Sequence, residues 1–139
     1  MDNCIFTIYV NDLQKSREFY YKLFGTEPEI DIDETLSMSD TAQLLEFHFD
    51  DWVLCIRPVE RYHDLFGNET GTELSHSNNI ITRTELFFYV ENRNKMISRL
   101  EKAGGKILHK KKEVQCDQRI EITAYGSDPD GNILAFCGK

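Results

Sequence analysis

The sequence predicts an α+β fold made of two copies of a βαβββ unit, and three observations lead to this prediction. Residues 8–25 align without a gap on residues 88–105, and the identical residues include a tyrosine, a valine, a lysine and a glycine. Residues 50–56 fall on residues 130–136 at the same spacing, turn on turn and strand on strand. Each copy also combines alternating strands with one amphipathic helix. Matches at one shared spacing indicate an internal duplication.

The two copies extend over about residues 4–58 and 84–138 and are joined by a linker over residues 59–83. The linker is rich in turn-forming residues and is long enough to act as a lid. A chain of 139 residues can fill one well-packed core but is too short for two independently stable domains. We therefore expect residues 1–139 to form a single domain.

In each copy a strand leads through a polar cap into a helix that ends at glycine. Asp12 and Asn92 are suited to accept hydrogen bonds from the first free backbone N–H groups of the helices. Gly25 and the pair Gly104–Gly105 are suited to end them. The apolar sides of the helices are expected to contain Leu13, Ser16, Phe19, Tyr20, Leu23 and Phe24 in the first copy and Met96, Ile97, Leu100 and Ala103 in the second.

The strands are expected to have one apolar face, which packs beneath the helices, and one mixed face. The apolar faces contain Phe6, Ile8 and Val10 in the first copy and Leu86, Phe88 and Val90 in the second. The mixed faces contain Ile5, Thr7, Tyr9, Val53, Cys55, Arg57, Glu85, Phe87, Tyr89, Arg119, Glu121, Thr123, Tyr125, Ile133, Ala135 and Cys137. A mixed face is suited to a cavity or an interface, and a solvent-exposed sheet surface is the alternative.

The last strand follows the turn "SDPDGN" over residues 127–132. Pro129 suits the second position of a tight turn, and Gly131 suits a position that needs a positive φ. The alternation of the following strand places Ala135 on the mixed face.

Composition and charge exclude several classes of partner. The net charge of −8 argues against nucleic acid, because the chain offers no broad basic face to neutralise phosphates. No segment approaches the roughly 20 apolar residues of a membrane span, and Asp2 is atypical of a secretory signal. The cysteines Cys4, Cys55, Cys116 and Cys137 form no C-x-x-C pair, which predicts reduced thiols. We therefore expect a cytoplasmic protein without nucleic-acid or membrane partners.

Four segments resemble the vicinal oxygen chelate superfamily, which includes glyoxalase I, extradiol dioxygenases, fosfomycin-resistance enzymes and bleomycin-resistance proteins. The segments are VNDLQKSREFYYKLFG (10–25), ELFFYVEN (85–92), LEKAGGKI (100–107) and DPDGNILAF (128–136). Together with the duplication, they extend the resemblance over nearly the whole chain. The resemblance implies two βαβββ modules whose curled mixed sheets surround a concave cavity, the glyoxalase/bleomycin-resistance-like fold. It also implies a homodimer, because relatives often complete each cavity with modules from two chains.

Metal-dependent members of this superfamily bind their ion with residues from the first and last strands of the modules. Carried onto this sequence by the resemblance, these positions are Ile5, Cys55, Glu85 and Ala135. Ile5 and Ala135 have no lone pair to donate, where relatives commonly place a histidine and a carboxylate. None of His48, His63, His76 and His109 has a spacing that would replace these donors, and each is expected at the surface. We therefore expect no metal ion and no other cofactor.

Eight residues are candidates for lining a ligand cavity, namely Tyr9, Cys55, Arg57, Glu85, Tyr89, Arg119, Glu121 and Tyr125. The tyrosine rings offer flat surface to a planar ligand. A carboxylate such as Glu85 needs a partner if it is partly buried. We expect Glu85 to pair with Arg57 or Arg119, and exposure to solvent is the alternative.

The first functional hypothesis is a metal-free small-molecule-binding protein. It would sequester an aromatic or cationic ligand in a groove, as the resemblance to bleomycin-resistance proteins implies. The acidic net charge favours a cationic ligand electrostatically. One alternative is a metal-dependent glyoxalase/lyase-type or dioxygenase-type enzyme, which Ile5 and Ala135 disfavour. The other is a regulatory or scaffold dimer, and the sequence assigns no catalytic residue.

Overall fold

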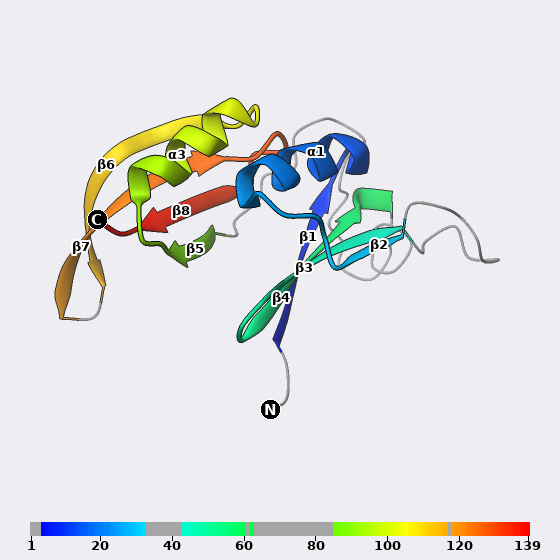
Figure 1. Cartoon of the computed structure of the whole chain (residues 1–139), viewed down its shortest axis with the longest axis horizontal. Coiled ribbons are helices and arrows are strands. Elements are labelled where there is room, and N and C mark those ends of the chain that lie inside the picture. The colour runs from blue at the N-terminus through cyan, green and yellow to red at the C-terminus, as the bar shows by residue number, and fades with distance from the viewer. Residues whose placement is uncertain (1–3, 33–42, 61, 63–84, 117) are drawn as a thin grey trace, which may run out of the picture. The chain divides into compact units, whose positions relative to one another are not determined.

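The computed structural model describes two compact units of the chain (Figure 1). The described residues are 4–32, 43–60, 62, 85–116 and 118–139. One unit is drawn from Met1–Arg17 and Thr26–Ile80, and the other from Glu18–Gly25 and Ile81–Lys139. The predicted linker lies almost entirely outside the described residues, and its role as a lid stays a prediction.

Each unit contains one four-stranded mixed sheet. The first sheet has the order β1-β4-β3-β2, formed by β1 (Cys4–Val10), β2 (Ile30–Ile32), β3 (Leu44–Phe49) and β4 (Trp52–Pro58). The second has the order β5-β8-β7-β6, formed by β5 (Glu85–Tyr89), β6 (Lys106–Cys116), β7 (Arg119–Ser127) and β8 (Ile133–Cys137). In each sheet the first strand pairs in parallel with the last strand of its module, and the other pairs are antiparallel.

Two helices complete the repeated element order, α1 (Leu13–Phe24) and α3 (Arg93–Lys102). The predicted α+β fold of two βαβββ modules is therefore confirmed. Neither of these helices is long and apolar enough to cross a membrane, and the rest of the described chain contains no such helix.

The internal repeat is visible in the register of the parallel strand pairs. Ile5 pairs with Val53 in the first sheet, and 80 residues later Glu85 pairs with Ile133 in the second. All the remaining paired positions of β5 and β8 likewise lie 80 residues after paired positions of β1 and β4. The spacing found in the sequence thus describes the strand pairing itself.

The ends of both helices form as the sequence predicts. The side chains of Asp12 and Asn92 each accept a hydrogen bond from the backbone N–H three residues later, at 3.1 and 2.9 Å. Gly25 and Gly104 follow the helices with φ angles of +72° and +98°. These are left-handed conformations that only glycine adopts without strain, so they end the helices.

Burial on β1 increases toward the end of the strand that leads into α1. Ile8 and Val10 are 4% and 0% exposed, as predicted for the apolar face. Phe6, however, is 47% exposed, so the prediction is wrong for this residue. Its ring packs edge-on against Trp52 instead, with the ring centroids 5.6 Å apart.

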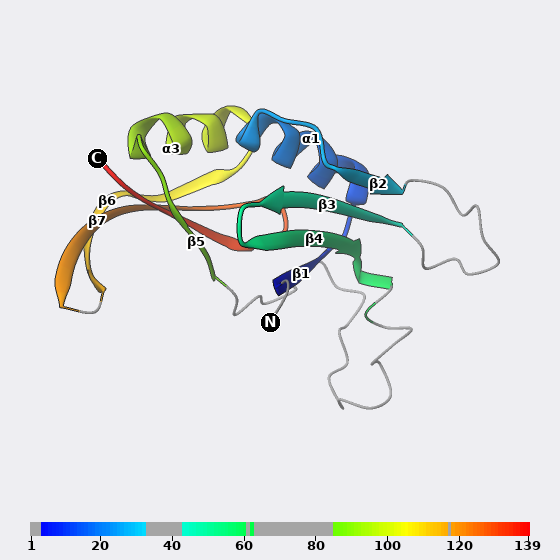
Figure 2. The ribbon, with the colours of Figure 1, turned by 60° about the horizontal axis from the view of Figure 1, so that its bottom comes forward.

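Helix α3 covers one face of the second sheet and contacts β6, β7 and β8 (Figure 1 and Figure 2). Ile97 and Leu100 are the buried residues of this helix. A Cβ atom at Gly126 of β7 would lie 2.7 Å from a methyl carbon of Leu100, closer than real contacts allow. The close approach of helix and sheet therefore depends on glycine at this position.

A buried hydrogen-bond network connects α1 with the turn before β8 inside the second unit. The Tyr20 hydroxyl donates to one carboxylate oxygen of Asp128 at 2.7 Å. The other oxygen accepts from the backbone N–H groups of Asp130 and Asn132 at 2.9 and 2.8 Å. Because Tyr20 is 0% and Asp128 3% exposed, these partners replace the water that the carboxylate has lost.

The same network keeps the Tyr20 hydroxyl protonated. Burial raises the pKa of Tyr20 well above its ordinary value of 10.0, and the neighbouring charge of Asp128 raises it further. The hydroxyl is thus held as a hydrogen-bond donor.

We expect removal of a side chain from this buried network to lower the free energy of unfolding more than the same change at an exposed position. Tyr20→Phe removes a hydrogen bond to a carboxylate and should lower the free energy of unfolding by about 1–3 kcal/mol. Asp128→Ala leaves several buried donors without an acceptor and should cost at least as much. Urea unfolding measures both, and Tyr21→Phe is the control because Tyr21 is 45% exposed. Equal stability of Tyr20→Phe and Tyr21→Phe would contradict this account.

A second expectation concerns alkaline pH. Since the pKa of Tyr20 is higher in the folded protein, its contribution to stability is complete below pH 10 and is lost as the pH rises further. Above pH 10 the unfolding free energy of the wild type should fall more steeply than that of Tyr20→Phe, by about 1.4 kcal/mol per pH unit. Urea unfolding between about pH 9 and pH 11 measures the unfolding free energies of the wild type and of Tyr20→Phe. Subtracting one pH profile from the other removes the contributions of the other tyrosines. Parallel pH profiles would exclude a buried, protonated Tyr20.

Candidate functional site

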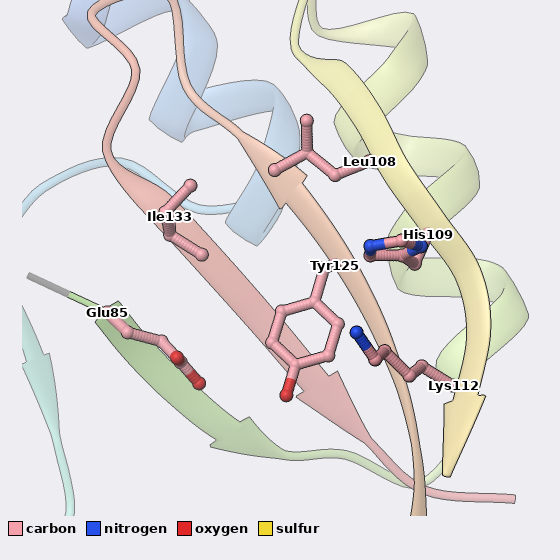
Figure 3. Close-up of a pocket in the computed structure, with 6 residues that line it drawn as sticks. All are labelled: Glu85, Leu108, His109, Lys112, Tyr125 and Ile133. Atoms are coloured by element: carbon pink, nitrogen blue, oxygen red, sulfur yellow. The ribbon is translucent and has the colours of Figure 1, made fainter. Parts of the chain in front are cut away.

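The mixed face of the second sheet has an open pocket of about 420 Å³. All four strands contribute to it, and its lining residues are Glu85, Leu108, His109, Lys112, Tyr125 and Ile133 (Figure 3). Two of these, Glu85 and Tyr125, are among the residues predicted from the sequence. The structure brings them together from β5 and β7, because the register places both on the same face of the sheet.

The three lining residues on β6 were not predicted, because this strand is irregular. Its pairing with β7 shifts register between Ile107 and His109 and again between His109 and Lys112. In a regular strand, neighbours such as Leu108 and His109 point to opposite faces. A bulge redirects side chains, and bulges are frequent beside binding sites. The strand faces were predicted from the alternation of side chains, which assumes a regular strand. The sequence therefore contained no signal for these shifts in register.

Charged and aromatic groups meet in the pocket. Figure 3 shows Glu85 and Lys112 extending toward Tyr125 from opposite sides. The His109 ring lies edge-on to the Tyr125 ring, with the ring centroids 6.2 Å apart. Neither Glu85 nor Lys112 makes a hydrogen bond or an ion pair with any other described residue. The pocket therefore offers a flat ring between two opposite charges.

The predicted pair of Glu85 and Arg119 is not formed. Arg119 lies at the start of β7 and pairs with Glu121, with 3.7 Å between guanidinium nitrogen and carboxylate oxygen. Glu85 lies beside Ile133, which pairs with Ser127 at the opposite end of β7. The length of β7 therefore separates the two side chains. Glu85 is instead exposed to solvent, which was the alternative prediction.

Two further candidates on this sheet do not line the pocket. Tyr89 is 71% exposed at the end of β5. Glu121 is half-buried and accepts a weak hydrogen bond from the Cys137 thiol at 3.7 Å. Like Arg119, they occupy the mixed face beyond the pocket, and a role in ligand binding stays a prediction for all three.

The remaining candidates form a polar cluster in the first unit. Tyr9 of β1 pairs in register with Arg57 of β4, and its ring lies edge-on to Tyr62 with the centroids 5.1 Å apart. Cys55 is 2% exposed and pairs in register with Thr7. Since Arg57 belongs to the first unit and Glu85 to the second, a pair between them stays a prediction.

The thiol of Cys55 is held in its neutral form. Burial raises the pKa of Cys55, and the nearby Glu46 carboxylate raises it further, while Arg57 and Thr7 partly offset this rise. A nucleophile requires the thiolate, which a raised pKa disfavours. Cys55 is therefore a buried packing residue whose sulfur accepts hydrogen bonds.

Glu46 and His48 are polar residues of β3 that the sequence analysis did not include in the mixed face. Glu46 pairs in register with Cys55, and its carboxylate lies 2.9 Å from the His48 ring nitrogen. The alternation of Leu44–Phe49 contains this signal, because the buried residues Leu45 and Phe47 alternate with the two polar residues. His48 is exposed, as predicted for this histidine.

The superfamily metal positions do not carry a suitable set of donors. Ile5 is 58% exposed and has only carbon atoms to offer. Ala135 is completely buried and lies in register between Phe87 and Tyr125. Of the four positions, only Glu85 presents an exposed donor atom. In the part of the chain that the structure describes, no group of three or more His, Cys, Asp and Glu side chains is arranged to hold a metal ion.

Comparison with known proteins assigns the family. A family model described as "Glyoxalase-like domain" matches residues 3–139. The chain belongs to the glyoxalase-like domain family. The superfamily resemblance predicted from the sequence is thereby confirmed. No curated protein sequence matches this glyoxalase-like chain significantly.

Solved structures share the glyoxalase-like fold at low sequence identity. A glyoxalase-related enzyme from Fulvimarina pelagi is 20% identical, with a TM-score of 0.73, over 98% of this chain and 86% of the other. A glyoxalase/bleomycin resistance protein/dioxygenase family enzyme from Burkholderia phytofirmans PsJN is 17% identical, with a TM-score of 0.68, over 96% and 95%. A glyoxalase/bleomycin resistance protein from Albidiferax ferrireducens T118 is 18% identical, with a TM-score of 0.63, over 98% of both chains. At these identities the likeness establishes the fold.

The state of Cys55 can be tested by alkylation. We expect iodoacetamide at pH 8 to modify the half-buried Cys4 well before Cys55 in the folded protein, because burial and a raised pKa both slow the reaction. Mass mapping of the modified cysteines over time measures the order, and the protein in denaturant is the control in which the difference should vanish. Faster modification of Cys55 than of Cys4 would instead identify an activated thiol.

Proposed function

We propose that this glyoxalase-like protein binds a small organic molecule in the pocket of the second unit, without a metal ion. The ligand carries an aromatic ring or a cationic group, and binding sequesters it rather than transforming it. The observation that carries this proposal is the placement of Tyr125 and Glu85 in one open pocket.

The chemistry of the pocket supports such a ligand. The Tyr125 ring provides flat, amphipathic surface, and Leu108 and Ile133 add apolar contacts. Glu85 provides a carboxylate that no other described residue neutralises. The net charge of −8 adds a long-range attraction for cations. A volume of about 420 Å³ lies within the range of pockets that hold small molecules.

The donor set supports binding without a metal. An ion at the superfamily position would need imidazole or carboxylate groups on both modules. This chain has aliphatic side chains at Ile5 and Ala135 and a neutral thiol at Cys55. Relatives whose descriptions name bleomycin resistance share the fold, which is compatible with a binding role.

Thermal shift with a panel of aromatic cations tests this proposal. A ligand that binds should raise the melting temperature of the wild type, because only the folded protein binds it. The increase should be the same before and after dialysis against a chelator, because the proposed binding requires no metal ion. Tyr125→Leu should weaken binding about tenfold through loss of ring contacts. Tyr21→Leu is the matched control, since Tyr21 is a 45% exposed tyrosine of α1 that does not line the pocket.

Elemental analysis of protein purified without added metal completes the test. A stoichiometric transition metal, together with loss of ligand binding after chelation, would overturn the metal-free proposal. Equal effects of Tyr125→Leu and Tyr21→Leu would show that the ligand does not bind in this pocket.

A further inference from the structure

We propose that the pocket selects ligands that carry a cationic group and an anionic group on opposite sides of a flat ring, that is, aromatic zwitterions. This inference rests on the proposed small-molecule binding and specifies the class of ligand. It follows from the positions of Glu85 and Lys112 on either side of Tyr125.

The two charges stand on opposite edges of the sheet. Glu85 belongs to β5 and Lys112 to β6, which are the outer strands of the order β5-β8-β7-β6. Since neighbouring strands lie about 4.8 Å apart, β5 and β6 are separated by three strand spacings, about 14 Å measured along the sheet. Both side chains extend inward toward Tyr125 (Figure 3). A ligand placed over this ring would therefore have a carboxylate on one side and an ammonium group on the other.

The two charges are also available to a ligand. Oppositely charged side chains in one pocket commonly pair, but no ion pair joins Glu85 to Lys112, and neither is paired with any other described residue. The Tyr125 ring lies between them (Figure 3). A zwitterion of matching length would satisfy both groups at once, whereas an aromatic cation would leave Lys112 without a partner.

The charge of β6 supports an anionic group in the ligand. The protein as a whole is acidic, with a net charge of −8, and this alone would favour a purely cationic ligand. Lys110, Lys111 and Lys112 nevertheless follow one another on β6, and Lys112 lines the pocket. The side of the pocket opposite Glu85 is therefore locally basic.

The flat part of the ligand has its own contacts. Figure 3 shows Leu108 and Ile133 at the end of the pocket away from Lys112. The His109 and Tyr125 rings are nearly perpendicular to each other, with an interplanar angle of 86°. An aromatic ring over Tyr125 thus contacts apolar and aromatic surface between the two charged groups.

Four probes of similar size separate the contributions: 4-(aminomethyl)benzoate as the zwitterion, benzylamine as the cation, benzoate as the anion and benzyl alcohol as the uncharged ring. Titration followed by backbone-amide NMR gives their affinities and shows which residues respond. Each exposed charge contact is worth about a threefold change in affinity. We therefore expect the zwitterion to bind about threefold more tightly than either singly charged probe and about tenfold more tightly than benzyl alcohol. Added salt should reduce this advantage.

Two neutralising variants assign the contacts. Glu85→Gln should weaken the zwitterion and benzylamine about threefold and leave benzoate unaffected or tighter. Lys112→Gln should weaken the zwitterion and benzoate and leave benzylamine unaffected. Glu91→Gln and Lys111→Gln are the matched controls, because these residues are exposed charges that do not line the pocket.

The outcomes distinguish this inference from the proposed function. Equal affinity for all four probes, weakened by Tyr125→Leu, would overturn zwitterion selection and leave small-molecule binding in place. Tightest binding of benzylamine, unaffected by Lys112→Gln, would likewise reduce the ligand class to aromatic cations. Absence of any binding in the pocket at about 10 mM probe, far above the range of a specific site, would overturn both.

Discussion

The buried carboxylate of Asp128 is the interaction on which the second unit depends. It accepts hydrogen bonds from Tyr20 of α1 and from the backbone of the turn that leads into β8. β8 pairs with both β5 and β7, so the conformation of this turn sets the register of three strands. A slip by one residue would move Ile133 to the other face and separate Glu85 from Tyr125. The geometry of the pocket thus follows from a hydrogen-bond network outside it.

Local patterns in the sequence predict what local interactions determine. Helix caps involve residues within one turn, and strand faces follow from alternation, so the caps at Asp12 and Asn92 and the facing of Glu85 and Tyr125 could be predicted. The hydrogen bond between Tyr20 and Asp128 joins residues 108 positions apart, and no local pattern encodes it. The register shifts of β6 are equally nonlocal, because they arise where this strand adapts to β7. For this reason only part of the pocket was predicted.

The two modules keep one backbone register but have different chemistry on their mixed faces. Corresponding rows across the strands are Thr7, Cys55 and Glu46 in the first module and Phe87, Ala135 and Tyr125 in the second. The first row is polar, and its Glu46 carboxylate lies 2.9 Å from the His48 ring nitrogen. The second row is aromatic and apolar, and the side-chain charges of Glu85 and Lys112 near it are not paired with other described residues. Polar groups that already have hydrogen-bond or ion-pair partners gain little free energy from contact with a ligand, whereas groups without such partners gain more. The second module is therefore better suited to binding.

Ala135 offers no donor atom at the superfamily metal position of the second module. The position is completely buried and lies in register between two aromatic residues. A carboxylate in such surroundings, without a cation or a donor beside it, would cost several kcal/mol. A surface that stacks flat rings solvates a buried charge poorly, so an alanine between aromatic neighbours suits this position. Glu85, at the exposed edge of the same sheet, avoids this desolvation cost.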